Sequence, residues 1–361
     1  MAPAPRANPE LRGQDAAVAV LRTAARSGRL PHGWLLTGPP GIGKATLAFR
    51  FARALLADPE ASDPDLAVDP AHPVFRQVAQ GSHPDLRVVE APRDPKTGKL
   101  KAEITVDLVR AATASLNTTA AQGGRRIVVI DGAESLNRNA ANALLKSLEE
   151  PPPGAVLLLV SHQPGRVAPT LRSRCAKLAL ARLPDAEVAA ALARHAPDLP
   201  AGQRDALAQL ARGSIGRALE LAGGDWLSLY HRLATGLAGM PPDRLALHAL
   251  AGELSRYADA RSFAAPFWLI QELLGRVVGA AIGRHAPALF EGEPEALARL
   301  AAGRPLDRWG SLWEKVARLA SAVDGLNLDR RQALLHILTL LALLSEKDQG
   351  AGSALGDLDG G

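Results

Sequence analysis

Three short apolar runs in the first half of the chain predict buried β-strands. They are "GWLLTG" (Gly33 to Gly38), "RRIVVID" (Arg125 to Asp131) and "AVLLLVS" (Ala155 to Ser161). A continuous apolar run of this length is typical of a strand covered on both faces, as in a parallel sheet. We therefore expect these strands to lie inside an α/β domain.

Amphipathic segments between the runs predict helices. After Lys44 the apolar residues recur at helical spacing, at Leu47, Ala48, Phe51, Ala52 and Leu55. A second helix is expected from about Asn139 to Glu150, because the prolines at 151–153 cannot continue it. The alternation of strand and helix predicts a doubly wound α/β domain over residues 15–183, which binds ligands at the carboxyl ends of its strands.

Beyond Leu183 the pattern is helical throughout. We expect a small helical domain over residues 184–240 and a larger one over 241–345. Residues 1–14 and 346–361 are polar and rich in proline or glycine, which predicts flexible tails. The most apolar run, Ala333 to Leu344, is shorter than the roughly 20 residues that span a bilayer and predicts a buried helix.

Composition and net charge exclude few classes of function. A net charge of +5 over 361 residues permits contact with nucleic acid without requiring it. The single cysteine, Cys175, excludes an intrachain disulfide and a cysteine-based zinc site, as expected in a reducing cytoplasm. The first residues lack the apolar segment of a signal peptide, so we expect a cytoplasmic protein that has no membrane partner.

The segment "GPPGIGKATLA" (Gly38 to Ala48) nearly matches the phosphate-binding pattern G-x-x-x-x-G-K-[ST]. Glycines let the backbone N–H groups of such a loop converge on phosphate. The candidate nucleotide-binding residues of this loop are Gly38, Pro39, Gly41, Gly43, Lys44, Ala45 and Thr46. Ala45 stands where a hydroxyl normally holds magnesium, and Thr46 comes one residue, or about 100° of helix, too late. Binding without hydrolysis is therefore expected, and a plain glycine-rich turn is the alternative.

Polar residues end the second and third predicted strands. Asp131 lies where a second acid of a phosphate-binding site meets magnesium, although it could instead cap the next turn. Ser161 and His162 follow the third strand. Asp131 and Ser161 are further candidates for contact with nucleotide.

Three segments, "GSHPDL" (Gly81 to Leu86), "AANALLKSLEEPP" (Ala140 to Pro152) and "LLLVSHQPGRVAPTLRSRC" (Leu157 to Cys175), resemble subunits of the bacterial clamp loader of DNA polymerase III. The resemblance is greatest to the delta-prime family, which is similar to the gamma/tau ATPase subunits. It is specific from about Gly33 to Leu183. It implies an AAA+ P-loop domain, then a helical lid at 184–240 and a helical collar domain at 241–345.

The resemblance gives Arg174 a role. "SRC" (Ser173 to Cys175) matches the family's Ser-Arg-Cys motif, whose arginine acts in trans as an arginine finger on a neighbouring subunit's ATP. A guanidinium offers forked, permanently charged donors to a γ-phosphate. Without the resemblance, Arg174 is more simply a solvated or salt-bridged surface residue.

The same resemblance predicts that hydrolysis is lost. Active relatives carry a glutamate where Gly132 stands and a second-sensor arginine where Gly216 stands, with Arg217 one position late. Together with Ala45, the chain thus differs from the active relatives at three positions that serve ATP hydrolysis. We expect ATP or ADP to bind weakly, at residues that include Arg217, without turnover.

The implied partners are gamma/tau and delta subunits, with the sliding clamp and primed DNA contacted through the complex. The chain itself is expected to have no activity, although it would be part of the polymerase III holoenzyme, a nucleotidyltransferase.

The family's four-cysteine zinc module has no counterpart between residues 61 and 86, where His72 and His83 are irregularly spaced, so no structural zinc is expected. "PRDPKTGKLKAEI" (Pro92 to Ile104) is either a solvated hairpin or a contact with DNA backbone.

Three alternatives remain open. The chain could be an active gamma/tau-type ATPase with an unusual loop. It could also be a P-loop phosphotransferase, although no acceptor-binding motif is visible, or a DNA-binding protein that acts without a partner.

Overall fold

The computed structural model describes residues 3–58, 60–92, 103–118, 121, 124–239, 244–256, 264–284, 286–302, 305–326 and 329–345. The chain divides into two compact units, Met1–Gly224 and Asp225–Gly361. The basic stretch at 93–102 and the predicted tail at 346–361 lie outside the described residues.

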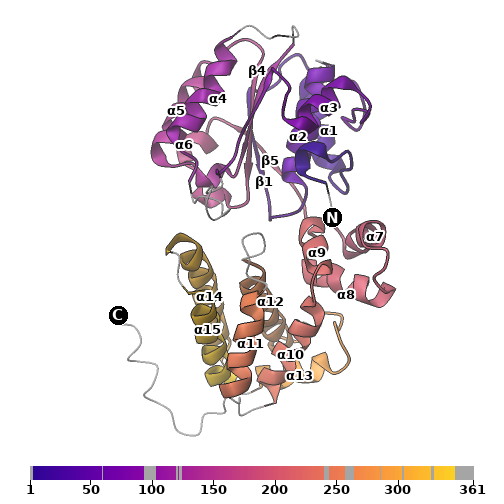
Figure 1. Ribbon diagram of the computed structural model, residues 1–361, viewed down its shortest axis with the longest axis vertical. Helices are drawn as coiled ribbons and strands as arrows, with labels where there is room; N and C mark the ends of the chain where they lie inside the picture. Colours follow the sequence, from indigo (N-terminus) through magenta and orange to yellow (C-terminus); the bar gives the residue numbers. More distant parts are fainter. Residues whose placement is uncertain are drawn as a thin grey trace. The chain divides into compact units, whose positions relative to one another are not determined.

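Five parallel strands form the sheet of the first unit (Figure 1), in the order β2-β3-β4-β1-β5. The three predicted strands are adjacent in it: β1 (Gly33–Thr37), β3 (Arg126–Asp131) and β4 (Ala155–Ser161). All seven residues of β4 are buried, as its apolar run predicts. The outer strands, β2 (Leu86–Val89) and β5 (Ala176–Ala179), have four residues each and mix buried with exposed positions, so their sequences carry little strand signal.

Helices cover both faces of the sheet (Figure 1). On one face lie α1 (Asp15–Arg26), α2 (Lys44–Ala57) and α3 (Pro73–Gln80). On the other lie α4 (Val106–Ala114), α5 (Arg138–Glu149) and α6 (Pro169–Arg172). Four short 3-10 turns complete the layers, η1 (Pro5–Ala7), η2 (Ser115–Asn117), η3 (Ala133–Ser135) and η4 (Pro164–Arg166).

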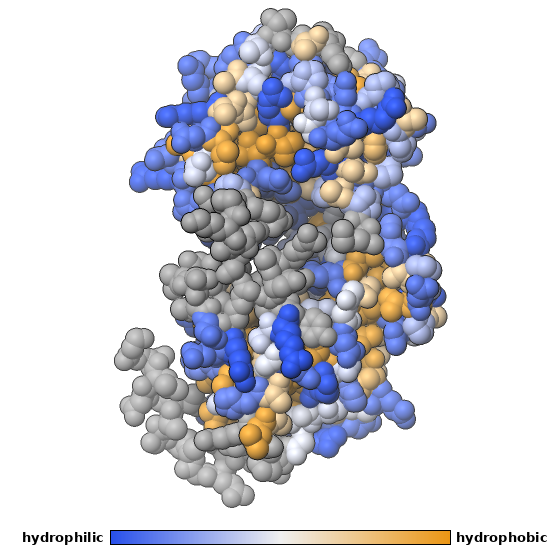
Figure 2. Space-filling model, viewed as in Figure 1, coloured by the Kyte–Doolittle hydropathy of each residue, from blue (hydrophilic) through white to orange (hydrophobic). Residues whose placement is uncertain are grey.

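Side chains that alternate along the strands divide the core into two halves. In β1, Trp34 and Leu36 join the cluster under α1 and α2, whereas Leu35 joins the cluster under α4 and α5. The predicted apolar face of α2 is completely buried at Leu47, Ala48, Phe51, Ala52 and Leu55. In Figure 2 apolar side chains gather near the middle of the first unit, with polar side chains around them.

Three further helices belong to the first unit and form the lid: α7 (Asp185–His195), α8 (Ala201–Ala211) and α9 (Ile215–Ala222). The second unit consists of α10 (Trp226–Ala238), α11 (Arg244–Arg256), α12 (Ala264–Ala281), α13 (Glu293–Ala301), α14 (Leu306–Leu326) and α15 (Arg330–Ser345). The predicted layout, an α/β domain with a parallel sheet followed by helical domains, is confirmed.

The boundary between the units differs from the sequence-based boundary at residue 240, because α10 packs in the second unit. There the buried carboxylate of Glu293 accepts hydrogen bonds from Tyr230 of α10 (2.7 Å) and from Arg276 of α12 (2.8 and 2.9 Å). The backbone N–H of Leu289 donates to the same carboxylate at 2.6 Å. Burial is the main cause that raises the pKa of Tyr230. A paired and fully hydrogen-bonded carboxylate of this kind ties three helices of one unit together.

The predicted buried helix near the end of the chain is α15. Its inward side chains, Leu334, Ile337, Leu338 and Leu341, are at most 2% exposed. Among the described helices, none is long and apolar enough to cross a membrane.

The described part of the predicted N-terminal tail, residues 3–14, packs on the first unit instead of extending freely. The buried guanidinium of Arg53 donates to the carbonyls of Arg6 and Asn8, both at 2.9 Å, and lies 4.4 Å from the centre of the Phe75 ring. Every residue has a backbone carbonyl, so the amino-acid sequence could not predict that Arg53 would bind these two.

We expect Arg53→Met to destabilise the first unit by about 1–3 kcal/mol, because two charge-assisted hydrogen bonds and a cation–π contact are lost. Urea unfolding measures the loss, and limited proteolysis should cut the released segment earlier. The control is Arg22→Met, whose exposed guanidinium donates one bond to Pro64. Equal stability of the two variants would contradict the anchoring role of Arg53.

Candidate functional site

The phosphate-binding loop lies between β1 and α2, as predicted. Gly43, at a φ of +100°, precedes the first residue of α2, Lys44. The Lys44 side chain is buried, and its Nζ donates to the carbonyl of Pro39 at 2.5 Å, within the loop itself. Ala45 is partly exposed at the start of α2 and Thr46 is buried.

Strand register brings the predicted polar residues to this loop. Ser161 ends β4 beside Thr37, the last residue of β1, and Asp131 pairs with Val160 at the end of β3. The buried Ser161 hydroxyl accepts the N–H of Gln163 at 3.2 Å. The carboxyl-terminal ends of strands β1, β3 and β4 therefore meet at one edge of the sheet, where a doubly wound fold binds its ligands.

Buried charges dominate this edge. Burial lowers the pKa of Lys44 to about 8, although Asp131 and Glu134 oppose this. Burial also raises the pKa of Asp131 to about 6; Glu90 adds to this and Lys44 opposes it. A lysine whose pKa is lowered and an aspartate whose pKa is raised, side by side at a sheet edge, are typical of a functional site.

Sequence reasoning gave no role to Glu134, which the structure adds to this cluster. The turn η3 returns the chain toward β4, so that a Glu134 carboxylate oxygen accepts the N–H of His162 at 3.1 Å. Burial, followed by the charge of Lys44, lowers the pKa of His162. The sequence feature that could have indicated Glu134 is its position as an acidic residue three positions after Asp131, one tight turn beyond the strand.

Gly132 has a φ of +87° and caps the turn after β3. Active relatives would carry the glutamate that orients water at this position. Residues with a side chain rarely adopt that backbone conformation, so a glutamate would be strained here. The backbone conformation at position 132 therefore favours glycine over any residue with a side chain.

The start of lid helix α9 rests directly on the phosphate-binding loop. The Ser214 hydroxyl donates to the Pro40 carbonyl, and the N–H of Gly216 donates to the Gly41 carbonyl, both at 2.9 Å. A Cβ atom on Gly216 would lie 2.8 Å from the Cα of Gly41, closer than such atoms approach. No side chain fits at 216 while the lid stays in this position.

Arg217, the other predicted lid residue, follows this contact. Its backbone N–H donates to the Ser214 hydroxyl at 3.1 Å, which caps α9. The structure thus brings the backbone of Arg217 to the loop region and places Gly216 in contact with the loop.

Arg174 lies at the opposite edge of the sheet. It precedes β5, whose first residue, Ala176, is in register with Trp34 near the start of β1. The loop follows Thr37, the last residue of β1. Because β1 has five residues, and a strand rises about 3.3 Å per residue, the two edges are separated by roughly 15 Å. Arg174 is therefore not part of the site formed by this chain's own loop.

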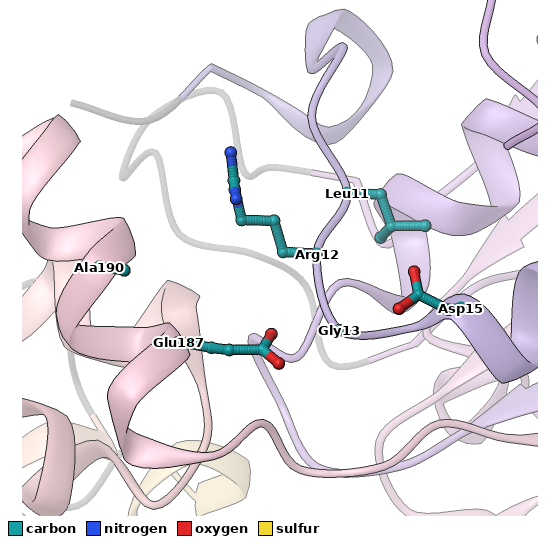
Figure 3. A pocket seen from close by; sticks show the side chains of 6 residues that line it. All are labelled: Leu11, Arg12, Gly13, Asp15, Glu187 and Ala190. Atoms are coloured by element: carbon teal, nitrogen blue, oxygen red, sulfur yellow. The ribbon is translucent and has the colours of Figure 1, made fainter.

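A cavity of about 290 Å³ lies beside the loop, between the N-terminal segment and the lid (Figure 3). Leu11, Arg12, Gly13 and Asp15 line one side, and Glu187 and Ala190 of α7 line the other. Figure 3 shows Glu187 pointing toward Gly13. Two carboxylates and one guanidinium make the wall polar.

The two histidines of the 61–86 segment serve local turns. His72 Nδ1 accepts the N–H of Val74 at the start of α3, and His83 Nδ1 accepts the N–H of Asp85, both at 3.2 Å. In the described part of the chain, no three histidine, cysteine, aspartate or glutamate side chains are placed to share a metal ion.

Comparison with known proteins gives the same assignment as the motifs. Residues 13–184 match the family described as DNA polymerase III, delta subunit. The chain is 43% identical to the DNA polymerase III subunit delta' of Pseudomonas aeruginosa over 193 residues, 53% of this chain and 56% of that protein. It is 35% identical to the delta' subunit of Escherichia coli over 218 residues, 60% of this chain and 62% of that protein.

The tau subunit of Escherichia coli is 30% identical over 171 residues, 47% of this chain and 25% of that subunit. The chain spans less than two thirds of the length of the delta' relatives that it matches. The resemblance to the delta-prime family that the motifs predicted is confirmed.

We expect Gly216→Ala to destabilise the first unit by about 1–3 kcal/mol, because the added methyl group overlaps the backbone of Gly41. The matched control is Gly202→Ala, the same change at the second residue of α8, where a Cβ atom would meet nothing within 4 Å. That control should be neutral or up to about 1 kcal/mol stabilising. Urea unfolding of both variants measures the difference; equal effects would mean that the lid does not press on the loop.

We expect Asp131→Asn to stabilise the first unit by about 1–3 kcal/mol at pH 7.5. The folded-state pKa, about 6, lies above the ordinary value of 3.8, so the aspartate favours folding most below pH 4 and loses that advantage as the pH rises through 6. The gain from asparagine should therefore shrink toward zero between pH 6 and pH 4. Urea unfolding at several pH values measures it, with the exposed Asp198→Asn as control. A gain independent of pH would contradict this origin.

Proposed function

We propose that this chain is a delta-prime-type clamp-loader subunit that does not hydrolyse ATP and supplies Arg174 to the ATP site of a neighbouring ATPase subunit. The observation that carries the proposal is the position of Arg174 at the sheet edge opposite to the chain's own loop. An arginine there cannot serve its own nucleotide but is accessible to another subunit, since its side chain is 37% exposed. The likeness to proteins named delta' supports the same reading.

Three features of the chain's own site argue against turnover. Ala45 offers no hydroxyl to magnesium. Gly132 replaces the acid that would orient water, in a backbone conformation that disfavours it. Gly216 replaces a phosphate-sensing arginine, at a contact that excludes side chains. Each feature removes a different part of the phosphoryl-transfer machinery.

We also propose that ATP or ADP binds this loop weakly. Lys44 already donates to the Pro39 carbonyl, and a phosphate would have to displace that bond. The adjacent cavity carries Asp15 and Glu187 together with Arg12, so its wall adds no net positive charge that would hold a polyphosphate. Without the hydroxyl at position 45, a magnesium ion that accompanies the nucleotide is held less firmly.

The partners that this function implies are gamma/tau and delta subunits in a ring. The sliding clamp and primed DNA would be contacted through the complex, which serves the DNA polymerase III holoenzyme. The helical second unit would hold the subunits together, as the resemblance implies for the collar, while Arg174 of the first unit reaches the neighbouring ATP site.

An active gamma/tau-type ATPase is the second candidate, favoured by the likeness to a tau subunit. The strained position of Gly132 and the Gly216 contact weigh against it. A P-loop phosphotransferase would leave the position of Arg174 without a use.

We expect Arg174→Ala to lower the ATPase rate of the reconstituted clamp loader, assayed with clamp and primed DNA, by at least about tenfold. Loss of an arginine finger costs about 10³–10⁵ at a single site, and the other ATP sites of the ring limit the observed loss. The control is Arg172→Ala, two residues earlier, and size-exclusion chromatography checks assembly of both complexes.

An unchanged rate in the assembled Arg174→Ala complex would refute the trans-acting arginine. The isolated wild-type chain is assayed beside it and should show no turnover. Turnover there would instead support the gamma/tau-type ATPase.

A further inference from the structure

Arg174 is held by three contacts on its own subunit. Its Nη2 lies 2.7 Å from a carboxylate oxygen of Glu149. Its Nη1 donates to the carbonyl of Thr170 at 3.2 Å and to the hydroxyl of Ser173 at 3.4 Å. Arg172, by comparison, donates to Pro164 at 3.5 Å. The guanidinium of Arg174 thus has a defined orientation in the subunit alone.

The backbones that carry this pair are fixed by buried neighbours. Glu149 is the last residue of α5 and follows Leu148, which is 3% exposed; Arg174 precedes Cys175, which is 7% exposed. Both neighbours pack against the start of β1, where a Cβ on Gly33 would lie 2.6 Å from Leu148 and 3.4 Å from Cys175. The close packing leaves the ion pair little freedom to shift as a whole.

The end of α5 adds to the attraction between the two charges. A carboxylate in the last turn of a helix faces the partial negative charge of the unsatisfied carbonyl groups, which favours a cation nearby. Arg174 supplies that cation. The pair occupies one side of the guanidinium, whose five donors leave others for a phosphate.

We propose that Glu149 is a positioning residue that holds Arg174 in the orientation needed to reach the triphosphate of a neighbouring subunit. The proposal rests on the proposed function of Arg174. A long, exposed arginine must otherwise lose its rotamer freedom at each turnover, and a carboxylate on a rigid helix end removes part of that loss in advance. Glu149 acts through Arg174 and does not touch the nucleotide.

The test is the steady-state ATPase of the reconstituted clamp loader, with clamp and primed DNA, over a range of ATP concentrations. Glu149→Gln should lower kcat by about two- to fivefold, the size expected for one partly exposed ion pair, and leave KM for ATP within about twofold. The matched control is Glu150→Gln, the same loss of charge at the next residue, which is exposed and should leave kcat unchanged.

A second pair of complexes separates positioning from a structural role. In an Arg174→Ala background, Glu149→Gln should have no further effect on kcat, since the group through which it acts is gone. Assembly of every complex is checked by size-exclusion chromatography and thermal unfolding. Loss of kcat in the wild-type background alone supports the proposal.

The other outcomes overturn it. An equal loss in both backgrounds would mean that Glu149 supports the fold at the end of α5. An unchanged or higher kcat for Glu149→Gln, when Arg174→Ala slows the complex, would mean that Glu149 is idle or restrains the arginine, and the proposed function would stand without it. An unchanged rate for Arg174→Ala would refute both proposals.

Discussion

The architecture depends on one buried strand. β1 is paired in parallel with β4 on one side and with β5 on the other, and its direction decides where everything else lies. Its carboxyl end continues into the phosphate-binding loop, whereas its amino end packs against the segments that carry Glu149 and Arg174. Five residues of strand thus hold a nucleotide-type site and an outward-facing arginine apart within one rigid layer.

The loop edge combines the glycines and lysine of a phosphate-binding pattern with Ala45, Gly132 and Gly216. Lys44, Asp131 and Ser161 meet there as in an active enzyme, and the buried lysine and aspartate retain shifted pKa values. The two glycines differ in what disfavours a side chain: at 216 the backbone of Gly41 occupies the space, whereas at 132 the space is open and only the left-handed backbone conformation disfavours one.

Much of this was readable from the amino-acid pattern. Apolar runs predicted the three central strands, and the glycine spacing predicted the loop, because both signals are local. The short outer strands, the anchored N-terminal segment and the partner of Arg174 were missed. Each depends on contacts between distant segments, such as Arg53 with Arg6 or Glu149 with Arg174, which no local spacing encodes. The bond from Tyr230 of α10 to Glu293, 63 residues further along, is another contact of this kind.

The contact between Gly41 and Gly216 limits which residues position 216 can accept. Once the two backbones touch, an arginine at 216 is no longer a neutral step, since it would first have to push the lid away. Likewise, a glutamate at 132 would have to adopt the left-handed backbone of the glycine it replaces. Neither position can therefore accept a larger residue by substitution alone: position 216 would require the lid to move, and position 132 would require a side chain in a left-handed backbone conformation.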